Sequence, residues 1–157
     1  MNQWLDDRAR RRVLAVASSG GHWVQLMRLR PALEDCAVAY VTTMADYRAD
    51  VGEARFYTVR HASRWNKCGL AVLALRLLWI ILWERPHVIV STGAAPGYLA
   101  IRIVKLLGAK GVWVDSIANV ERLSMSGEMI GRHADLWLTQ WPHLAKTEGP
   151  VFEGAVL

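Results

Sequence analysis

Short runs of apolar residues alternate along the chain with longer stretches in which apolar residues recur at helical spacing. The short runs predict strands at residues 13–17, 38–42, 56–59, 88–90, 112–114 and 136–139, and a short final strand at 151–152. The longer stretches predict helices at residues 22–33, 69–83 and 96–107. Alternating apolar strands and helices are typical of a parallel sheet covered on both faces. The pattern therefore predicts an α/β fold, a Rossmann-like parallel sheet with helices on both faces.

Proline and glycine predict where two of these helices begin and end. Pro31 is expected to close the first helix, because proline has no backbone N–H and its ring clashes with the preceding turn. Pro96 falls in the first turn of the third helix, where the missing N–H costs nothing. Gly108 is expected to stop that helix.

The helix predicted at residues 69–83 is apolar on nearly all of its faces, and Arg76 is its only charged residue. Such a helix has to be buried somewhere. One interpretation is a core helix covered by the sheet and its neighbours. The other is a helix partly sunk in a membrane surface, where Arg76, Trp79 and Trp83 contact the headgroup region. Its 15 residues are fewer than the roughly 20 that cross a bilayer, so we expect peripheral attachment without a spanning helix.

The chain of 157 residues has a net charge of +5, which favours anionic partners such as phosphorylated substrates or an acidic membrane leaflet. Part of this charge lies in a basic N-terminal arm, residues 1–12, at Arg8, Arg10, Arg11 and Arg12. The arm is either solvated or in contact with anionic lipid headgroups. Residues 13–157 are expected to form one domain, since this length buries a single core.

The N-terminus is polar and charged, so we expect neither a signal peptide nor a spanning segment there. The two cysteines, Cys36 and Cys68, have neither metal-ligand nor disulfide spacing. They indicate reduced thiols of a cytosolic protein.

The first predicted strand runs into the turn Ser18-Ser19-Gly20-Gly21-His22. Ligands of parallel sheets bind beyond the carboxyl ends of the strands. Two glycines allow a tight turn and let a ligand approach the backbone, and the helix that follows directs free N–H groups at an anion. His22 could take a proton from a hydroxyl group, because imidazole exchanges protons near neutral pH. The alternative for His22 is a structural or capping role.

Two further turns lie at the same predicted edge of the sheet. Gly93 follows the fourth strand and leads, with Gly97, into a helix whose N-terminus could hold a pyrophosphate; close packing of helix on strand is the alternative. Asp115, Asn119 and Arg122 follow the fifth strand and are more polar than a connection requires. Asp115 could orient a hydroxyl group or act as a base, and Arg122 could pair with a phosphate. The alternative is a helix cap at Asp115 and a surface ion pair.

Other chemistries are not indicated. The five histidines show no metal-ligand spacing, so we expect no metal site. The glycine turns do not match the dinucleotide fingerprint, whose glycines are spaced G-x-G-x-x-G. Basic and aromatic residues at 60–65 occur without a known nucleic-acid motif, so we expect no nucleic-acid partner.

The turn at residues 18–22 and the segment at residues 114–144 together resemble a known family. The most specific parts of the segment are Leu-Ser-Met-Ser-Gly at 123–127 and Gln-Trp-Pro at 140–142. They resemble the membrane-recruiting subunit of the two-subunit UDP-GlcNAc transferase of dolichol-linked oligosaccharide synthesis, and its bacterial relatives in capsule and exopolysaccharide assembly. That family is similar to the N-terminal half of single-chain GT-B glycosyltransferases.

The resemblance implies an acceptor-binding, membrane-associated subunit of a split, inverting glycosyltransferase on the cytoplasmic face of the membrane. It implies that a separate donor-binding subunit holds most of the UDP-sugar, and that the sugar passes to a polyprenyl-pyrophosphate-linked saccharide. No cofactor is expected beyond these substrates. The chain without its partner subunit is expected to be inactive.

The resemblance also assigns roles to individual residues. It makes His22 and Asp115 the catalytic candidates, although Asp115 stands where the eukaryotic subunit usually has glutamate. It matches Gly20 and Gly21 to the family's first glycine turn, and Gly93 and Gly97 to the second, which holds the acceptor pyrophosphate. With the candidates from the residues themselves, the expected acceptor-binding residues are Ser19, Gly20, Gly21, Gly93, Gly97, Asn119 and Arg122.

Two other functions stay open at this point. The chain could be a non-catalytic membrane scaffold that recruits the catalytic glycosyltransferase subunit. It could also be a nucleotide-binding Rossmann module that acts alone, which the missing fingerprint disfavours. The sequence leaves the transferred sugar open.

Overall fold

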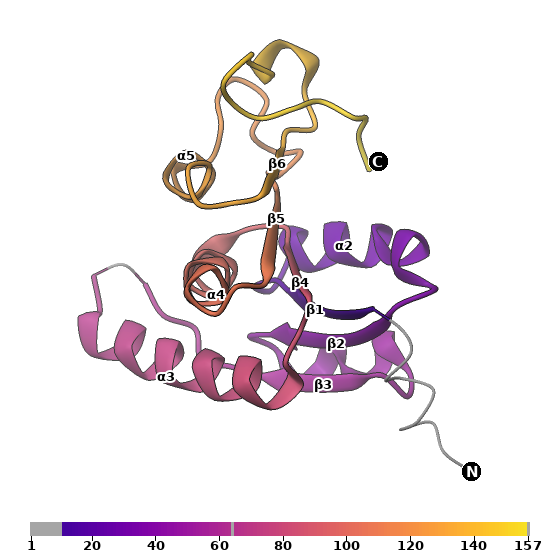
Figure 1. Ribbon diagram of the computed structural model, residues 1–157, viewed down its shortest axis with the longest axis vertical. Helices are drawn as coiled ribbons and strands as arrows, with labels where there is room; N and C mark the ends of the chain where they lie inside the picture. The colour runs from indigo at the N-terminus through magenta and orange to yellow at the C-terminus, as the bar shows by residue number, and fades with distance from the viewer. Residues whose placement is uncertain (1–10, 64, 157) are drawn as a thin grey trace.

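Six parallel strands form one sheet in the computed structural model, which describes residues 11–63 and 65–156 (Figure 1). The strands are β1 (Arg12–Val16), β2 (Ala37–Thr42), β3 (Arg55–Thr58), β4 (Val88–Ser91), β5 (Lys110–Val114) and β6 (Leu136–Leu138). Their order across the sheet is β3-β2-β1-β4-β5-β6. The order reverses between β1 and β4, and in such sheets ligands bind beyond the carboxyl ends of the strands at this switch point. The predicted Rossmann-like sheet is confirmed.

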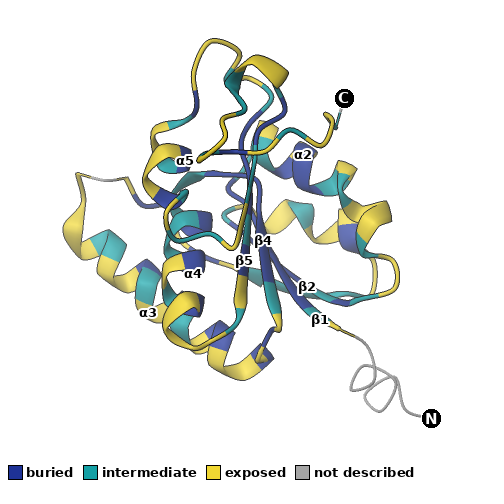
Figure 2. Cartoon of the chain, turned by 45° about the horizontal axis from the view of Figure 1, so that its top comes forward, coloured by how far each residue is buried: buried dark blue, intermediate teal, exposed yellow. Residues whose placement is uncertain are grey.

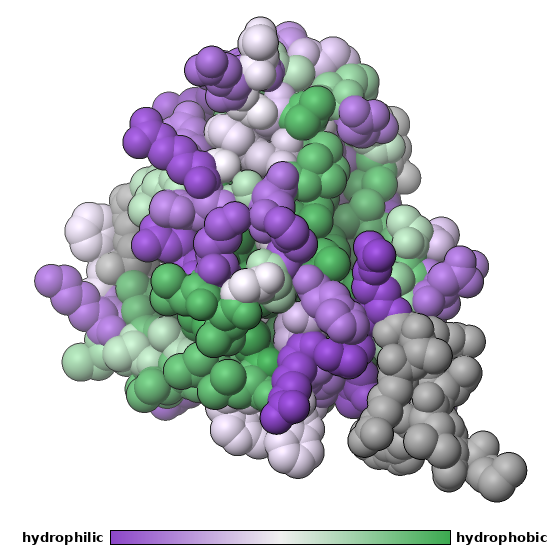
Figure 3. All heavy atoms as spheres, viewed as in Figure 1, coloured by the Kyte–Doolittle hydropathy of each residue, from purple (hydrophilic) through white to green (hydrophobic). Residues whose placement is uncertain are grey.

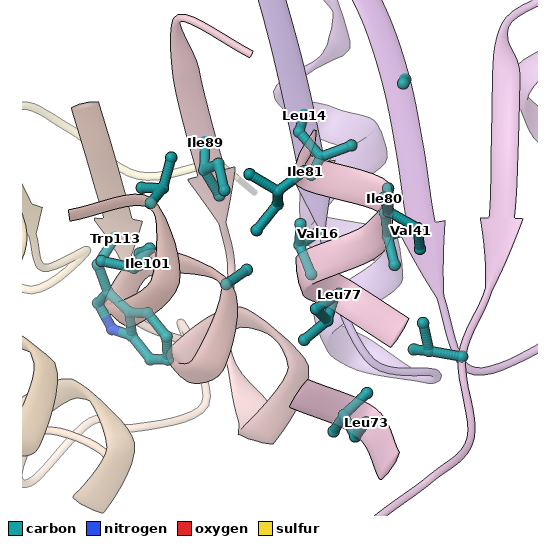
Figure 4. Close-up of a cluster of buried hydrophobic side chains, with 14 of the residues drawn as sticks. Leu14, Val16, Val41, Leu73, Leu77, Ile80, Ile81, Ile89, Ile101 and Trp113 are labelled. Carbon is teal, nitrogen blue, oxygen red and sulfur yellow. The ribbon is translucent and has the colours of Figure 1, made fainter. Parts of the chain in front are cut away.

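Helices cover both faces of the sheet, as the sequence predicted. One face carries α2 (Gly21–Arg28) and the short helix η2 (Ala45–Val51). The other face carries α3 (Lys67–Glu84), α4 (Ala94–Leu106) and α5 (Met125–Ile130). Successive residues of a strand point to opposite faces. Leu14 and Val16 accordingly pack under α3 and α4 (Figure 4). Ala15 packs on the α2 side.

The largest difference from the sequence prediction lies after α2. The predicted helix at residues 22–33 ends at Arg28, and a separate 3₁₀ helix, η1 (Arg30–Leu33), follows it. The residue before a proline avoids the α conformation, and Pro31 lacks the N–H that would continue the ladder. The helix therefore ends one turn before the proline.

Several smaller boundaries also differ. β1 begins at Arg12, so this residue belongs to the sheet and not to the basic arm; residues 1–10 of the arm lie outside the described residues. The strand predicted at 151–152 is a single bridge between Val151 and Leu138. The sequence did not predict η2, α5 or the short η3 (Pro142–Leu144).

One face of α3 is buried and the other is exposed, as the alternating colours along this helix show in Figure 2. The sheet-facing side chains are fully apolar except at the end, where buried Glu84 accepts a hydrogen bond from the Tyr57 hydroxyl. Glu84 also pairs with Arg55, whose Nε lies 3.0 Å from Oε2. Burial, and then the hydrogen bond to Glu84, raise the pKa of Tyr57 to about 12. This cluster anchors the end of α3 to β3.

Candidate functional site

The first glycine turn lies between β1 and α2 and is hydrogen-bonded to Thr43, which follows β2, and to Tyr47 of η2. The backbone N–H of Ser19 donates to Thr43 Oγ1 (3.1 Å), and that of Gly20 donates to the Tyr47 hydroxyl (3.1 Å). Gly20 has a φ of +71°, a conformation that favours glycine. A Cβ added at Gly20 or Gly21 would meet no atom within 4 Å. The backbone of this turn is therefore accessible to a ligand.

His22, the second residue of α2, reaches across the switch point to the end of β4. Its Nδ1 lies 2.9 Å from the carbonyl oxygen of Thr92, and the Thr92 hydroxyl donates to the His22 carbonyl (2.6 Å). A carbonyl oxygen can only accept, so Nδ1 carries the proton in this contact and Nε2 is the basic nitrogen of the neutral ring. The contact fixes both the tautomer and the direction of the ring.

Gly93 and Gly97 have different surroundings, although both lie in the second glycine turn or just beyond it. A Cβ on Gly93 would lie 2.4 Å from the His22 ring, so the absence of a side chain lets the two turns meet. The neighbouring Ala94 has a φ of +65°, which is uncommon for a residue with a side chain. Gly97 is buried, and a Cβ there would lie 1.8 Å from Ser91 Oγ. The absence of a side chain at Gly97 therefore lets α4 pack closely on β4.

Asp115 follows β5 and is 2% exposed. Its carboxylate accepts hydrogen bonds from Trp113 Nε1 (3.1 Å), from the backbone N–H and hydroxyl of Ser124, and from Asn119 Nδ2 (3.3 Å). Ser124 is the N-cap of α5. Asp115 therefore closes the loop at residues 116–123 and supports the start of α5. Its oxygens are all engaged in these contacts.

The remaining predicted residues lie on that loop. Asn119 is held against Asp115, whereas the side chain of Arg122 is exposed. Two aromatic residues that follow β6 fix the loop from the other side, because Trp141 Nε1 donates to the Ile117 carbonyl (2.8 Å) and His143 Nε2 lies 2.6 Å from the Val120 carbonyl. The loop is thus tied to β5 and β6. His22 and Gly93 are in direct contact in the structure. Asp115 and Asn119 belong to a separate hydrogen-bond network beside them.

Sequence reasoning missed one buried polar residue of this region, Gln25. It lies one turn after His22 and hydrogen-bonds to Ser116 and to Gln140. A polar residue between the buried Trp23 and Leu26 was the available signal. Among the described residues, no group of three or more His, Cys, Asp or Glu side chains is placed to hold a metal ion.

The exposed side of α3 is an apolar surface, which we call the α3 face: Val72, Leu75, Trp79, Leu82 and Trp83. The rings of Trp79 and Trp83 are stacked with centroids 6.1 Å apart, and the guanidinium of Arg76 lies 4.7 Å from the Trp79 ring centroid. Figure 3 shows hydrophobic side chains gathered over the region of α3 and α4. Within the described ranges, no helix is both long and apolar enough to span a bilayer.

The sheet and its helices define a class by fold, a Rossmann-like α/β domain that is similar to about half of each of two larger solved structures. Acinetobacter baumannii MurG superposes with a TM-score of 0.73 at 13% identity, over 90% of this chain and 45% of that one. UDP-N-acetylglucosamine 2-epimerase from Rickettsia bellii superposes with a TM-score of 0.71 at 10% identity, over 94% and 45%. The chain thus spans about half the length of these structures, and the likeness is one of fold.

The particular family follows from sequence. The chain belongs to the family described as "Oligosaccharide biosynthesis protein Alg14 like", whose model matches residues 13–155. The UDP-N-acetylglucosamine transferase subunit ALG14 of Yarrowia lipolytica is 37% identical, over 86% of this chain and 76% of its own length. The subunit of the same name from Homo sapiens is 26% identical, over 84% and 76%. The expected family is confirmed.

Proposed function

We propose that this chain is the acceptor-binding, membrane-associated subunit of a split glycosyltransferase, inactive until a donor-binding subunit joins it. The observation that carries the proposal is the position of His22, whose ring bridges the two glycine turns at the switch point of the sheet. The relatives named as UDP-N-acetylglucosamine transferase subunits support the reaction class. Residues 13–157 form the acceptor-binding domain in this proposal.

The reaction is a single displacement with inversion at the anomeric carbon. An acceptor hydroxyl attacks that carbon and forms the new C–O bond, while the bond to the UDP oxygen breaks and UDP leaves with the electron pair. His22 Nε2 takes the hydroxyl proton. The Thr92 carbonyl accepts a hydrogen bond from Nδ1–H, which orients the ring and stabilises the imidazolium that forms.

The diphosphate of the lipid-linked acceptor lies at the first and second glycine turns. The N-termini of α2 and α4 both open there, and their free N–H groups and dipoles attract an anion. Gly20 and Gly21 provide exposed backbone at this edge beside the half-buried Ser19, and the buried Gly93 lets the two turns meet. Arg122 adds a positive charge from the neighbouring loop. The proposal includes no cofactor beyond the UDP-sugar and the lipid-linked acceptor.

Asp115 acts as a positioning residue in this mechanism. A carboxylate that already accepts hydrogen bonds from Trp113, Asn119 and Ser124 would have to break one of them to serve as the base. His22 needs no such rearrangement. We therefore assign the proton transfer to His22. Asp115 sets the shape of the loop at residues 116–123, which we call the acceptor loop.

The α3 face attaches the chain to the membrane surface without crossing it. Trp79 and Trp83 lie at headgroup level, and Arg76 pairs with lipid phosphates. α3 follows β3, so its N-terminus lies at the same edge of the sheet as the glycine turns. A lipid-linked acceptor can then extend from the bilayer to His22. The free thiols Cys36 and Cys68 support a reducing compartment, and hence the cytoplasmic side of the membrane.

Reconstitution with the donor-binding subunit tests the proposal. Transfer from UDP-sugar to a polyprenyl-pyrophosphate-linked saccharide is expected for the complex and not for either chain alone. A purified chain that transfers sugar by itself would contradict the split enzyme. A complex whose rate does not depend on His22 would instead support the scaffold that only recruits the catalytic subunit.

A further inference from the structure

A pair of buried amides links the helix that carries His22 to the ends of β5 and β6. Gln25 and Gln140 are 4% and 3% exposed. Gln140 Nε2 donates to Gln25 Oε1 (2.9 Å) and to the Asp115 carbonyl (2.9 Å). Gln25 Nε2 donates to Ser116 Oγ (3.0 Å). The amide pair therefore holds α2 against the start of the acceptor loop.

The same pair also contacts the C-terminal segment. Gln140 Oε1 accepts a hydrogen bond from the backbone N–H of Val156 (2.9 Å), and Arg28 of α2 donates to the Val156 carbonyl (3.2 Å). A cavity of about 200 Å³ lies beside this contact, between Leu29, Gln140 and Val156. Gln140 thus joins three parts of the chain that lie far apart in sequence.

The geometry restricts how α2 can move. The helix is tied to β4 through His22 and Thr92, and to β5 and β6 through Gln25. The contacts of His22 and Gln25 lie one helical turn apart, so together they restrict rotation of α2. Buried amides that are hydrogen-bonded to one another and to their neighbours favour one arrangement over nearby ones. An apolar pair would fill the same space without this directional constraint.

We propose that Gln25 and Gln140 are positioning residues for sugar transfer, which set the direction in which His22 Nε2 faces the acceptor hydroxyl. This inference rests on the proposed function, in which His22 is the base. The pair does not touch the substrates. It acts through the orientation of α2, and we expect it to affect the rate of the chemical step.

The test is a double-mutant cycle in the complete complex with the donor-binding subunit. Gln25→Met and Gln140→Met each remove the hydrogen bonds and keep the volume. We expect each to lower kcat about tenfold, because small misplacements of a catalytic group slow the reaction. The double variant should be no slower than either single variant, since both break one constraint. KM for the UDP-sugar should not change, because the donor is held by the partner.

A second readout does not depend on activity. The NMR signal of the His22 Cε1–H in the full chain is expected to shift or broaden in both glutamine variants. Tyr57→Phe is the matched control, because it removes a partly buried side-chain hydrogen bond beside β3, the edge strand farthest from β6. The control should destabilise the fold without changing kcat or the His22 signal. Glutamine variants with wild-type kcat and an unchanged His22 signal would overturn the inference. An inactive wild-type complex would overturn the proposed function, and the His22 signal would then still test whether the amide pair orients the ring.

Discussion

Gly93 lies so close to His22 that a Cβ on Gly93 would be 2.4 Å from the Cε1 and Nδ1 atoms of the ring. The two residues come from different strand–helix turns and are 71 positions apart in the sequence. Gly93 also has a φ of +141°, so a side chain there is strained as well as obstructed. Through this contact the backbone of the second glycine turn limits where the His22 ring can lie. It is the direct link between the glycine turns and the proposed chemistry.

Gly93→Ala is therefore expected to displace the His22 ring. We expect kcat of the complex to fall about 100-fold, the scale on which a misplaced catalytic group slows a reaction. Gly108→Ala is the matched control, because Gly108 also has a positive φ but no atom lies within 4 Å of an added Cβ. Steady-state kinetics measure kcat for the complexes that contain each variant. Equal rates for the two would contradict the role given to the His22–Gly93 contact.

Replacement of Asp115 should affect stability as well as activity. Asp115→Asn replaces one of the two carboxylate oxygens with an NH₂ group. Both oxygens accept hydrogen bonds in the wild type, from Trp113 and Ser124 among others, so one set of donors loses its acceptor. We expect the free energy of unfolding to fall by about 2 kcal/mol, since buried donors lose their acceptor. Urea denaturation measures this change. A variant as stable as the wild type but without activity would make Asp115 the base instead.

The Tyr57–Glu84 contact predicts a loss of stability at high pH. The pKa of Tyr57 is raised from 10.0 to about 12 in the folded chain, so folding favours the protonated phenol. Its contribution is fully present below pH 10 and is lost as the pH rises through about 12. Denaturation curves recorded across this interval should show the loss in the wild type. Tyr57→Phe should be less stable at neutral pH and should lack this part of the pH dependence.

The α3 face should bind anionic vesicles through its aromatic residues. We expect the double variant Trp79→Gln, Trp83→Gln to bind at least about tenfold more weakly, because each exposed indole loses its burial in the interface. Met44→Gln is the control, since Met44 is exposed before η2, on the other face of the sheet. Vesicle sedimentation with phosphatidylglycerol measures the binding. Unchanged binding of the tryptophan variant would place the membrane contact elsewhere.

The strands could be predicted from sequence because a parallel sheet buries both of its faces. Val13 to Ala17 are all buried, and a short continuous apolar run that ends in a glycine turn is typical of such a strand. The position of His22 could be predicted as well, because a turn that follows a parallel strand lies at the carboxyl edge of the sheet. The six residues of α5 were not predicted, because a single short turn that contains Gly127 shows no helical period.

The network around the site could not be predicted, because it depends on contacts between distant parts of the chain. Gln25 and Gln140 are 115 positions apart, and no local pattern indicates that their amides meet. The sequence also left open whether the apolar α3 helix is core or surface. All of its faces are apolar, so only the packing shows that Leu73 and Leu77 face the sheet whereas Leu75 and Trp83 face outwards.

The central claim is that this subunit supplies the base, and His22→Ala tests it most directly. The variant should still assemble with the donor-binding subunit, and thermal stability and complex formation are the checks. The rate of sugar transfer at saturating UDP-sugar is then compared with that of the wild-type complex. The proposal predicts a rate at least about 100-fold lower, as expected for the loss of a general base. A fully assembled His22→Ala complex that transfers sugar at the wild-type rate would contradict it.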